Sequence, residues 1–203
     1  MDQEERQLLA ALQRGEEAAF DVLVRRFQHK VYGMCLRLMG ERQEAEDVAQ
    51  EVFLSVFRHI GSFRGESSLS TWLWRVTRNH CLNRIKHLKR RHHRQHLSLE
   101  SPGERENQTR TRDLPAGEES RPDSRLEDKQ LRQLLEAEIA RLTPEHREII
   151  VFADLEHLGY EEIQQITGLP LGTIKSRLHR ARLELASRLA PYLEDSGERK
   201  NGP

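Results

Sequence analysis

The fold of the C-terminal part of the chain is decided by the stretch GYEEIQQITGLPLGTIKSRLHRARLELASRL, Gly159 to Leu189. Its apolar spacing predicts a short helix over 160–167, a tight turn at Gly168-Leu169-Pro170 and a longer helix over 171–189. Upstream, Thr143-Pro144 is typical of a helix start, with Thr as the N-cap and Pro in the first helical position. The apolar run that follows predicts one helix from Glu145 to Leu158, closed by Gly159. Two helices joined through a glycine-containing turn predict a helix-turn-helix.

The last of these helices has two faces of different chemistry. Its inner face is apolar: Leu171, Ile174, Leu178, Ala181 and Leu185. Its outer face and flanks carry hydroxyl, imidazole and cationic groups: Thr173, Lys175, Ser176, Arg177, His179, Arg180 and Arg182. No acid occurs from Leu171 to Leu183, and Arg180 is the best candidate for a bidentate contact with guanine in a major groove. The alternative, an ordinary helical hairpin, does not account for a face without acids.

A segment poor in apolar residues precedes this module. Between Ser98 and Arg125 only Leu99, Leu114 and Ala116 are apolar, while Pro and Gly recur. Such a segment cannot bury enough surface to offset the entropy lost on ordering it. We therefore expect an all-α protein of two small helical domains joined by a flexible linker. The expected boundaries are 4–96 and 127–193 for the domains, 97–126 for the linker and 194–203 for a flexible tail.

The composition excludes several classes of protein. The 203 residues hold 33 basic and 33 acidic side chains, but residues 1–98 hold 17 basic against 12 acidic ones. No apolar run approaches the roughly 18 residues of a membrane-spanning helix, and the first residues, MDQEE, do not form a secretory signal. Two cysteines are too few to staple a secreted fold. We expect a soluble protein of a reducing cytoplasm.

A helix predicted over 45–60 has an apolar residue at the centre of its polar face. One stripe is typical of a core-facing surface: Ala45, Val48, Ala49, Val52, Phe53, Val56 and Ile60. The opposite face carries Asp47, Gln50, Glu51, Leu54 and Arg58, with Phe57 at its edge. Leu54 is either a stray leucine on a solvated surface or the apolar centre of a docking surface, acidic at its rim, for a basic partner.

The region 75–94 contains eight basic residues and no acidic one, a density typical of phosphate binding. One stripe of this helix is predicted to be buried: Leu73, Trp74, Thr77, Cys81, Ile85 and Leu88. A second stripe combines an aromatic ring with amides and cations: Trp72, Arg75, Asn79, Asn83 and Lys86, with Arg78 at its margin. An aromatic ring can stack on an unpaired base, and amides suit base edges. A basic helix that is merely solvated is the alternative.

The loop FRGESS, Phe63 to Ser68, directly precedes this helix. It is rich in hydroxyl groups and ends in a serine that is typical of an N-cap. We expect such a flexible loop to be able to wrap an extruded base.

Several histidines near the end of this helix are candidate metal ligands. His87, His92, His93 and His96 follow Cys81, and His92 and His96 have the i, i+4 spacing of metal ligands. Four Arg or Lys residues lie among them and disfavour a divalent cation, so we expect no metal. Cys35 and Cys81 are either redox-sensing thiols or, as we expect, inert buried ones. No phosphate-binding glycine loop or Ser/His/Asp arrangement indicates a cofactor or catalysis.

Two stretches resemble the extracytoplasmic-function (ECF) group of bacterial RNA polymerase sigma factors, in the sigma-70 superfamily. The first is EAEDVAQEVFL, Glu44 to Leu54, continued by FRGESS and by TWLWR, Thr71 to Arg75. The second is LTPEHRE, Leu142 to Glu148, followed by GYEEI, Gly159 to Ile163, and GTIKSRLHRAR, Gly172 to Arg182. Their order, with a linker between them, makes the resemblance specific.

The resemblance implies a role for each surface, with the first domain similar to sigma region 2 and the second to sigma region 4. Residues that would bind core polymerase are Asp47, Gln50, Glu51, Leu54 and Phe57. Residues that would recognise and melt the −10 element are Arg64, Gly65, Ser67, Ser68, Trp72, Arg75, Asn79, Asn83 and Lys86, with Asn79 and the loop closest to a flipped base. Residues that would recognise the −35 element are Thr173, Lys175, Ser176, Arg177, His179 and Arg180.

The resemblance also implies the partners of the protein. These are core RNA polymerase (the β′ clamp helices and the β flap), promoter DNA and an anti-sigma factor, with no small-molecule substrate, no cofactor and no enzymatic activity. Gln164 and Thr167 depart from the small and aliphatic residues usual in the family. Two alternative functions remain. One is a stand-alone helix-turn-helix regulator, which would not need the Leu54 face. The other is a metal-dependent nucleic-acid enzyme that uses the histidines at 92, 93 and 96.

Overall fold

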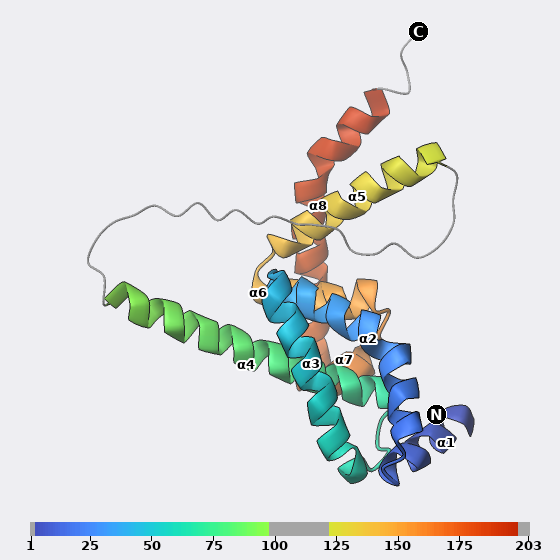
Figure 1. Ribbon diagram of the computed structural model, residues 1–203. Helices are drawn as coiled ribbons and strands as arrows, with labels where there is room; N and C mark the ends of the chain where they lie inside the picture. Colours follow the sequence, from blue (N-terminus) through green and yellow to red (C-terminus); the bar gives the residue numbers. More distant parts are fainter. Residues whose placement is uncertain (1–2, 98–121, 199–203) are drawn as a thin grey trace. The chain divides into compact units, whose positions relative to one another are not determined.

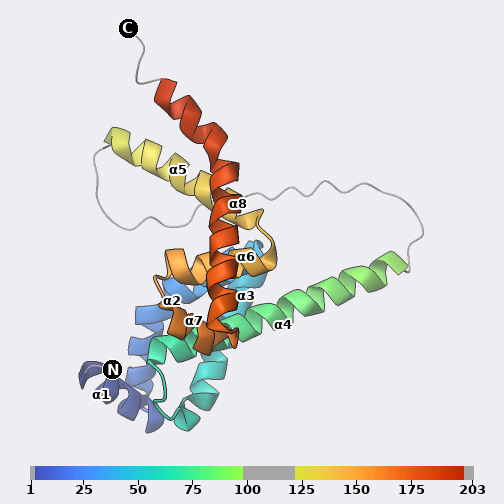
Figure 2. The same ribbon diagram turned by 180° about the vertical axis from the view of Figure 1, so that it is seen from behind.

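The computed structural model describes residues 3–97 and 122–198, with side chains over 3–91 and 131–192. Every element in these ranges is helical, which confirms the predicted all-α fold (Figures 1 and 2). The elements are α1 (Gln3–Gln13), α2 (Glu17–Met39), α3 (Arg42–His59), η1 (Ile60–Ser62), α4 (Leu69–Leu97), α5 (Pro122–Ala140), α6 (Pro144–Ile150), η2 (Val151–Leu155), α7 (Tyr160–Thr167) and α8 (Leu171–Glu198). None of the described helices combines the length and apolar character needed to cross a membrane.

The described helices form two compact units. The first holds α1 to α4, and the second holds α5, α6 and α8 with the greater part of α7. In the first unit α2, α3 and α4 pack on one another, and α1 packs on α2 and η1. The apolar stripe predicted over 45–60 faces this core: its residues are buried except Phe53, which is half-buried.

α4 is longer than the bundle that supports it. Leu73, Trp74, Thr77 and Cys81 of its predicted stripe are buried, whereas Ile85 and Leu88 are only half-buried. The helix continues past α2 and α3 at this point, so its later turns have no helix of the first unit to pack against (Figures 1 and 2). The buried Thr77 hydroxyl donates to the Leu73 carbonyl at 2.9 Å, which satisfies its polar group inside the core.

The two cysteines lie in the core of the first unit. Cys35 on α2 and Cys81 on α4 are both free and fully buried. A hydrogen bond with Cys81 and burial together raise the pKa of the Cys35 thiol. Because the thiolate is the reactive form, these surroundings agree with the prediction of inert thiols.

In the second unit, α6 packs on α8, and α5 contacts both of them. The Thr143 N-cap is confirmed, since its hydroxyl accepts a hydrogen bond from the His146 backbone N–H at 3.4 Å. A single helix predicted from Glu145 to Leu158 is wrong in its second half: α6 ends at Ile150, and the chain continues as the π-helical segment η2. Five consecutive residues, 148–152, are buried. A regular α-helix turns only part of its circumference to one face of a core, and the wider π turn that follows α6 changes which side chains face inward.

The helix-turn-helix follows the prediction closely. α7 spans 160–167, and Gly168, at φ 74°, ends it with its N–H bonded to the Gln164 carbonyl at 2.8 Å. The positive φ explains why glycine stands in the turn. Ile163 and Ile166 supply the buried face of α7, whereas Gln164 is exposed and Thr167 half-buried, so the two departures from the family pattern lie outside the core.

Some expectations fall at the edges of the described ranges. The expected linker lies mostly outside the described residues, with α4 ending at Leu97 and α5 beginning at Pro122. α8 continues through Pro191 to Glu198, into the stretch expected to be a tail. The side chains of His92, His93 and His96 lie outside the described part. Within that part, no three His, Cys, Asp or Glu residues are grouped as metal ligands.

Candidate partner and nucleic-acid interfaces

The outward face of α3 carries an exposed apolar centre. Leu54 is 56% exposed and Phe57 is 57% exposed, while Asp47, Gln50 and Glu51 are exposed around them. All five are turned outward because the opposite stripe of α3 packs on α2 and α4. We call these five residues the docking face. Large apolar side chains half open to solvent inside a polar rim are typical of a protein–protein interface.

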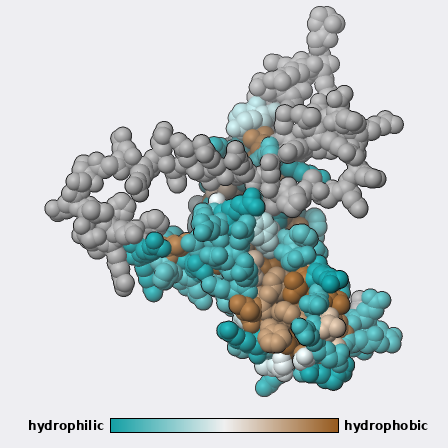
Figure 3. Space-filling model, in the orientation of Figure 1, coloured by the Kyte–Doolittle hydropathy of each residue, from teal (hydrophilic) through white to brown (hydrophobic). Residues whose placement is uncertain are grey.

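α2 extends the docking face, which the periodicity of a single helix could not reveal. The rings of Phe20 on α2 and Phe57 on α3 pack edge to face, with centroids 5.1 Å apart. A groove of about 400 Å³ also lies between α2 and α3, lined by Val24, Gln28, His29, Tyr32, Glu46, Ala49, Gln50 and Phe53. Apolar residues gather on this side of the first unit (Figure 3). Gln50 therefore belongs to both the docking face and the groove.

Glu51 also belongs to an ion cluster between α3 and α4. Arg84 on α4 donates to Glu44 at 2.8 Å and to Glu51 at 2.6 Å, and His80 Nδ1 lies 3.7 Å from the Glu51 carboxylate. Burial disfavours the charge on Arg84, but the carboxylates of Glu51 and Glu44 outweigh burial and raise the pKa of the guanidinium. The cluster fixes the rim of the docking face to α4, the helix predicted to read DNA.

The predicted nucleic-acid stripe lies on the outer side of α4. Trp72 and Arg75 are half-buried, and Asn79, Asn83 and Lys86 are exposed. At a rise of about 1.5 Å per residue, this stripe is about 21 Å long. The Trp72 ring rests on Phe63 with centroids 5.3 Å apart. Arg75 Nε is buried without a hydrogen-bond partner among the described residues.

The loop before α4 has an open tip and a fixed end. Arg64, Gly65 and Glu66 at the tip are exposed, and Gly65 has a φ of 72° that favours glycine. At the helix end, the Ser68 hydroxyl accepts from the Thr71 backbone N–H at 3.0 Å, which confirms the predicted serine N-cap. Ser68 also shares its hydroxyl with the Ser70 and Thr71 hydroxyls. Ser68 therefore orders the start of α4, besides its predicted contact with DNA.

The outer face of α8 presents the residues predicted to read duplex DNA. Lys175, Ser176, His179 and Arg180 are exposed, whereas Thr173 and Arg177 are half-buried. Ile174, Leu178 and Ala181 on the inner face are buried, which fixes the rotation of the helix. Lys175 Nζ lies 5.6 Å from the centre of the Tyr160 ring on α7, within the range of a cation–π contact.

Arg182, at the flank of this face, makes an internal ion pair. Its guanidinium donates twice to Asp154 in η2, at 2.5 Å and 3.1 Å. The hydrogen bond with Asp154 raises the pKa of Arg182. The π-helical segment thereby holds α8 through a bidentate contact, which is geometrically more specific than a lysine pair.

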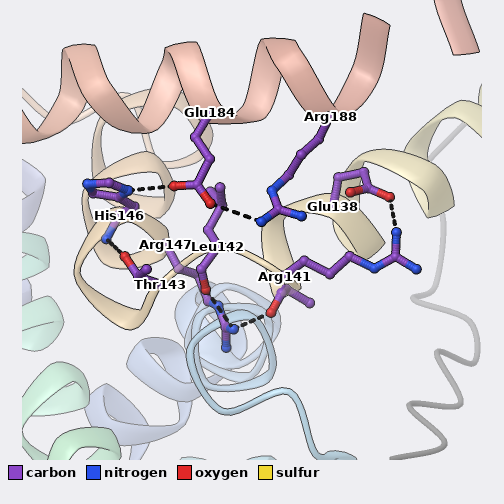
Figure 4. A network of polar contacts seen from close by, with 9 residues as sticks. Glu138, Arg141, Leu142, Thr143, His146, Arg147, Glu184 and Arg188 are labelled. Carbon is purple, nitrogen blue, oxygen red and sulfur yellow. Dashed lines mark hydrogen bonds and ion pairs between the residues drawn. The ribbon is translucent and has the colours of Figure 1, made fainter. Parts of the chain in front are cut away.

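A polar network ties α8 to α6, and α6 to the end of α5 (Figure 4). Glu184 accepts from His146 Nδ1 at 2.7 Å and from Arg188 at 3.1 Å, and the bond from His146 lowers the pKa of Glu184. Arg147 donates to the backbone carbonyls of Ala140, the last residue of α5, and of Leu142 just after it, and burial lowers the pKa of Arg147. The sequence pattern did not reveal this network, because its members come from three separate helices.

The sequence of the chain matches two known families in the same order as these units. Residues 23–91 match "Sigma-70 region 2" and residues 132–185 match "Sigma-70, region 4". The RNA polymerase sigma-H factor of Pseudomonas aeruginosa is 33% identical over 194 residues, covering 96% of this chain and 98% of that protein. The ECF RNA polymerase sigma-E factor of Escherichia coli strain K12 is 32% identical, covering 92% of this chain and 94% of that protein.

Solved structures share the fold. CnrH in complex with the cytosolic domain of CnrY is 20% identical, covers 92% of this chain and 97% of its own, and has a TM-score of 0.62. The sigma factor RpoE in complex with the anti-sigma factor NepR, from Bartonella quintana, is 24% identical, covers 84% and 96%, and also has a TM-score of 0.62. The chain therefore belongs to the ECF group of the sigma-70 family of RNA polymerase sigma factors.

Proposed function

We propose that this protein is the promoter-specificity subunit of a bacterial RNA polymerase, which binds core enzyme and directs transcription initiation at its own promoters. The observation that carries the proposal is the pairing of two surfaces on one small unit: the docking face on α3 and the basic stripe on α4. A stand-alone DNA-binding regulator needs the second surface but has no use for the first. The fixed connection through Arg84 keeps the two surfaces in one geometry.

The docking face binds the β′ clamp helices of core polymerase. Leu54 and Phe57 supply apolar area that is still open to solvent, and Asp47, Gln50 and Glu51 supply the acidic and polar rim for a basic helix surface. The second unit contacts the β flap. In this proposal, region 2 spans residues 4–96 and region 4 spans residues 127–193.

The stripe on α4 and the loop before it bind the melted −10 element. The positive charge without any acid attracts the phosphates and sets the register. Asn79 and Asn83 offer a donor and an acceptor to base edges, and Trp72 offers an aromatic face at the rim of the loop. Contacts that exist only with an unpaired, extruded base make the open duplex the tighter-bound form, so binding free energy opens the promoter without covalent chemistry.

The outer face of α8 binds the −35 element in the major groove. Arg180 and His179 lie on the exposed side toward base edges with Ser176, while Lys175, Arg177 and Thr173 lie at the margins for phosphate contacts. We further propose that the protein acts in the cytoplasm, is not an enzyme, and is held inactive by an anti-sigma factor. The support for the inhibitor is that the RpoE structure of the same fold is a complex with an anti-sigma factor.

Run-off transcription tests the proposal. The purified chain is mixed with core RNA polymerase and promoter fragments that the mixture selects from genomic DNA. We expect transcripts that need both the chain and the core enzyme. Binding of the same fragments by the chain alone, with no transcripts on adding core enzyme, would instead identify a stand-alone regulator. Cleaved or modified DNA that depends on an added metal ion would identify a nucleic-acid enzyme.

A further inference from the structure

Helix α1 contacts both ends of the loop before α4. At the first end, Gln13 Nε2 donates to the Phe63 carbonyl at 2.8 Å, across 50 positions of sequence. At the second end, the Glu5 carboxylate accepts from the Leu69 backbone N–H at 2.8 Å, across 64 positions. Gln13 and Glu5 are eight residues apart on one helix, so they lie about 12 Å apart along its axis. The two loop ends are therefore attached to one rigid element.

The hydrogen bond from the Leu69 N–H to Glu5 stabilises the start of α4. Leu69 is the first residue of the helix, and its N–H is one of the donors that an α-helix leaves without an internal partner. The Ser68 hydroxyl satisfies the N–H of Thr71 in the same turn. A carboxylate at this end also interacts favourably with the helix dipole. Glu5 and Ser68 thus cap α4 jointly, each at a different backbone N–H, and together they fix where the loop ends.

The loop between these anchors combines fixed ends with an open tip. Phe63 is buried and contacts the Trp72 ring, which belongs to the nucleic-acid stripe. The tip residues Arg64, Gly65 and Glu66 are exposed. A site that receives an extruded base gains affinity when its shape exists before binding, because less conformational entropy is then lost on binding.

We propose that α1 is a positioning element for −10 recognition, in which Gln13 and Glu5 hold the Arg64–Ser68 loop in the shape that receives an extruded base. This inference rests on the proposed function and assigns a role to the N-terminal helix, which carries no DNA-facing residue of its own in the proposal. Gln13 and Glu5 are positioning residues, since each acts through the backbone of the loop.

Two isosteric exchanges, Gln13→Glu and Glu5→Gln, test the anchors, because the first removes a hydrogen bond to the loop and the second keeps one. Gln13→Glu removes the donor and sets a carboxylate against the Phe63 carbonyl, so it breaks the first anchor. Glu5→Gln keeps an acceptor oxygen for the Leu69 N–H, whereas Glu5→Ala removes it. Gln7→Ala and Glu4→Gln change exposed residues of the same helix and serve as matched controls.

The assay uses reconstituted holoenzyme on a promoter fragment that the wild-type holoenzyme selects from genomic DNA. Opening is followed by permanganate reactivity of the −10 thymines. We expect Gln13→Glu and Glu5→Ala to reduce promoter opening by about tenfold, because each variant leaves one polar group of the loop backbone without its hydrogen-bond partner. We expect Glu5→Gln to stay within about threefold of wild type. Core affinity of all variants should match that of the controls, while the lost bond should lower the melting temperature of Gln13→Glu and Glu5→Ala by only a few degrees, so that it stays well above the assay temperature.

A scan of abasic sites separates positioning from general destabilisation. Each −10 position of the nontemplate strand is replaced in turn by an abasic nucleotide. If the anchors act through the captured base, the Gln13→Glu defect disappears at the one position where the wild type itself loses most, and persists elsewhere. An equal defect on every template, or none on the intact promoter, would overturn the inference. Failure of the wild-type holoenzyme to open the promoter would instead overturn the proposed function.

Discussion

Replacing Leu54 tests the docking face directly. Burying a whole leucine side chain contributes about 1.5–3 kcal/mol, and Leu54 leaves 56% of its surface open. Covering the remainder on docking therefore contributes about 0.8–1.7 kcal/mol. Leu54→Ala should weaken core binding by about 4- to 18-fold. Leu54→Asp also buries an unpaired carboxylate beside Glu51 and should weaken it by more than about 100-fold.

The assay is a fluorescence titration of the labelled chain with core polymerase. Val22→Asp is the matched control: Val22 is 52% exposed on α2, and its spacing turns it away from Phe20 and Val24 on that helix. The control should leave affinity within about twofold of wild type. Because Leu54 lies outside the core, thermal unfolding of all three variants should match the wild type. Equal affinities for Leu54→Asp and Val22→Asp would refute the docking face.

Three further predictions concern DNA recognition and stability. Arg180→Ala should weaken −35 binding by about 1–3 kcal/mol at one base pair, measured with holoenzyme on a set of single-substitution promoters; an equal loss on every sequence would mean that Arg180 contacts only phosphate. The lowered pKa of Glu184 means that its ionised form stabilises the second unit above its ordinary pKa of 4.5, and that this stability is lost as pH falls through the lowered pKa. Urea unfolding should therefore show a smaller loss of stability below pH 4.5 for Glu184→Gln than for wild type, and identical slopes would contradict the role of the His146 bond. Arg84→Met should reduce the free energy of unfolding by about 1 kcal/mol, since the partners of Arg84 are partly exposed. Chemical denaturation that shows no change would mean that the Arg84 ion cluster does not stabilise the first unit.

The sequence predicted those features that depend on spacing within one helix. The inward stripe of α3 left Leu54 outside because successive residues turn by a fixed angle, and that rule is local. The outer face of α8 followed for the same reason, with Gly168 marking the turn. The N-cap at Ser68 could also be predicted, since a serine directly before a helix start commonly caps the first backbone N–H groups of the helix.

Features that join distant segments could not be predicted from the sequence. The bonds of Gln13 and Glu5 to the loop link residues 50 and 64 positions apart, and nothing in α1 marks these two polar residues as special. The addition of Phe20 to the docking face likewise needs the packing of α2 on α3. The π turn at 151–155 was missed because four consecutive apolar residues fit either a strand or a buried helix, and periodicity does not decide between them.

Footprinting on one promoter tests the central claim most directly, namely that a single chain binds core polymerase and two promoter elements together. Hydroxyl-radical protection is mapped with the chain alone, with core enzyme alone and with both, and permanganate reactivity is mapped in parallel. The account predicts protection of both the −10 and −35 elements, and open −10 thymines, only when the chain and core enzyme are present together. Full protection by the chain alone, or protection without opening when core enzyme is added, would contradict it.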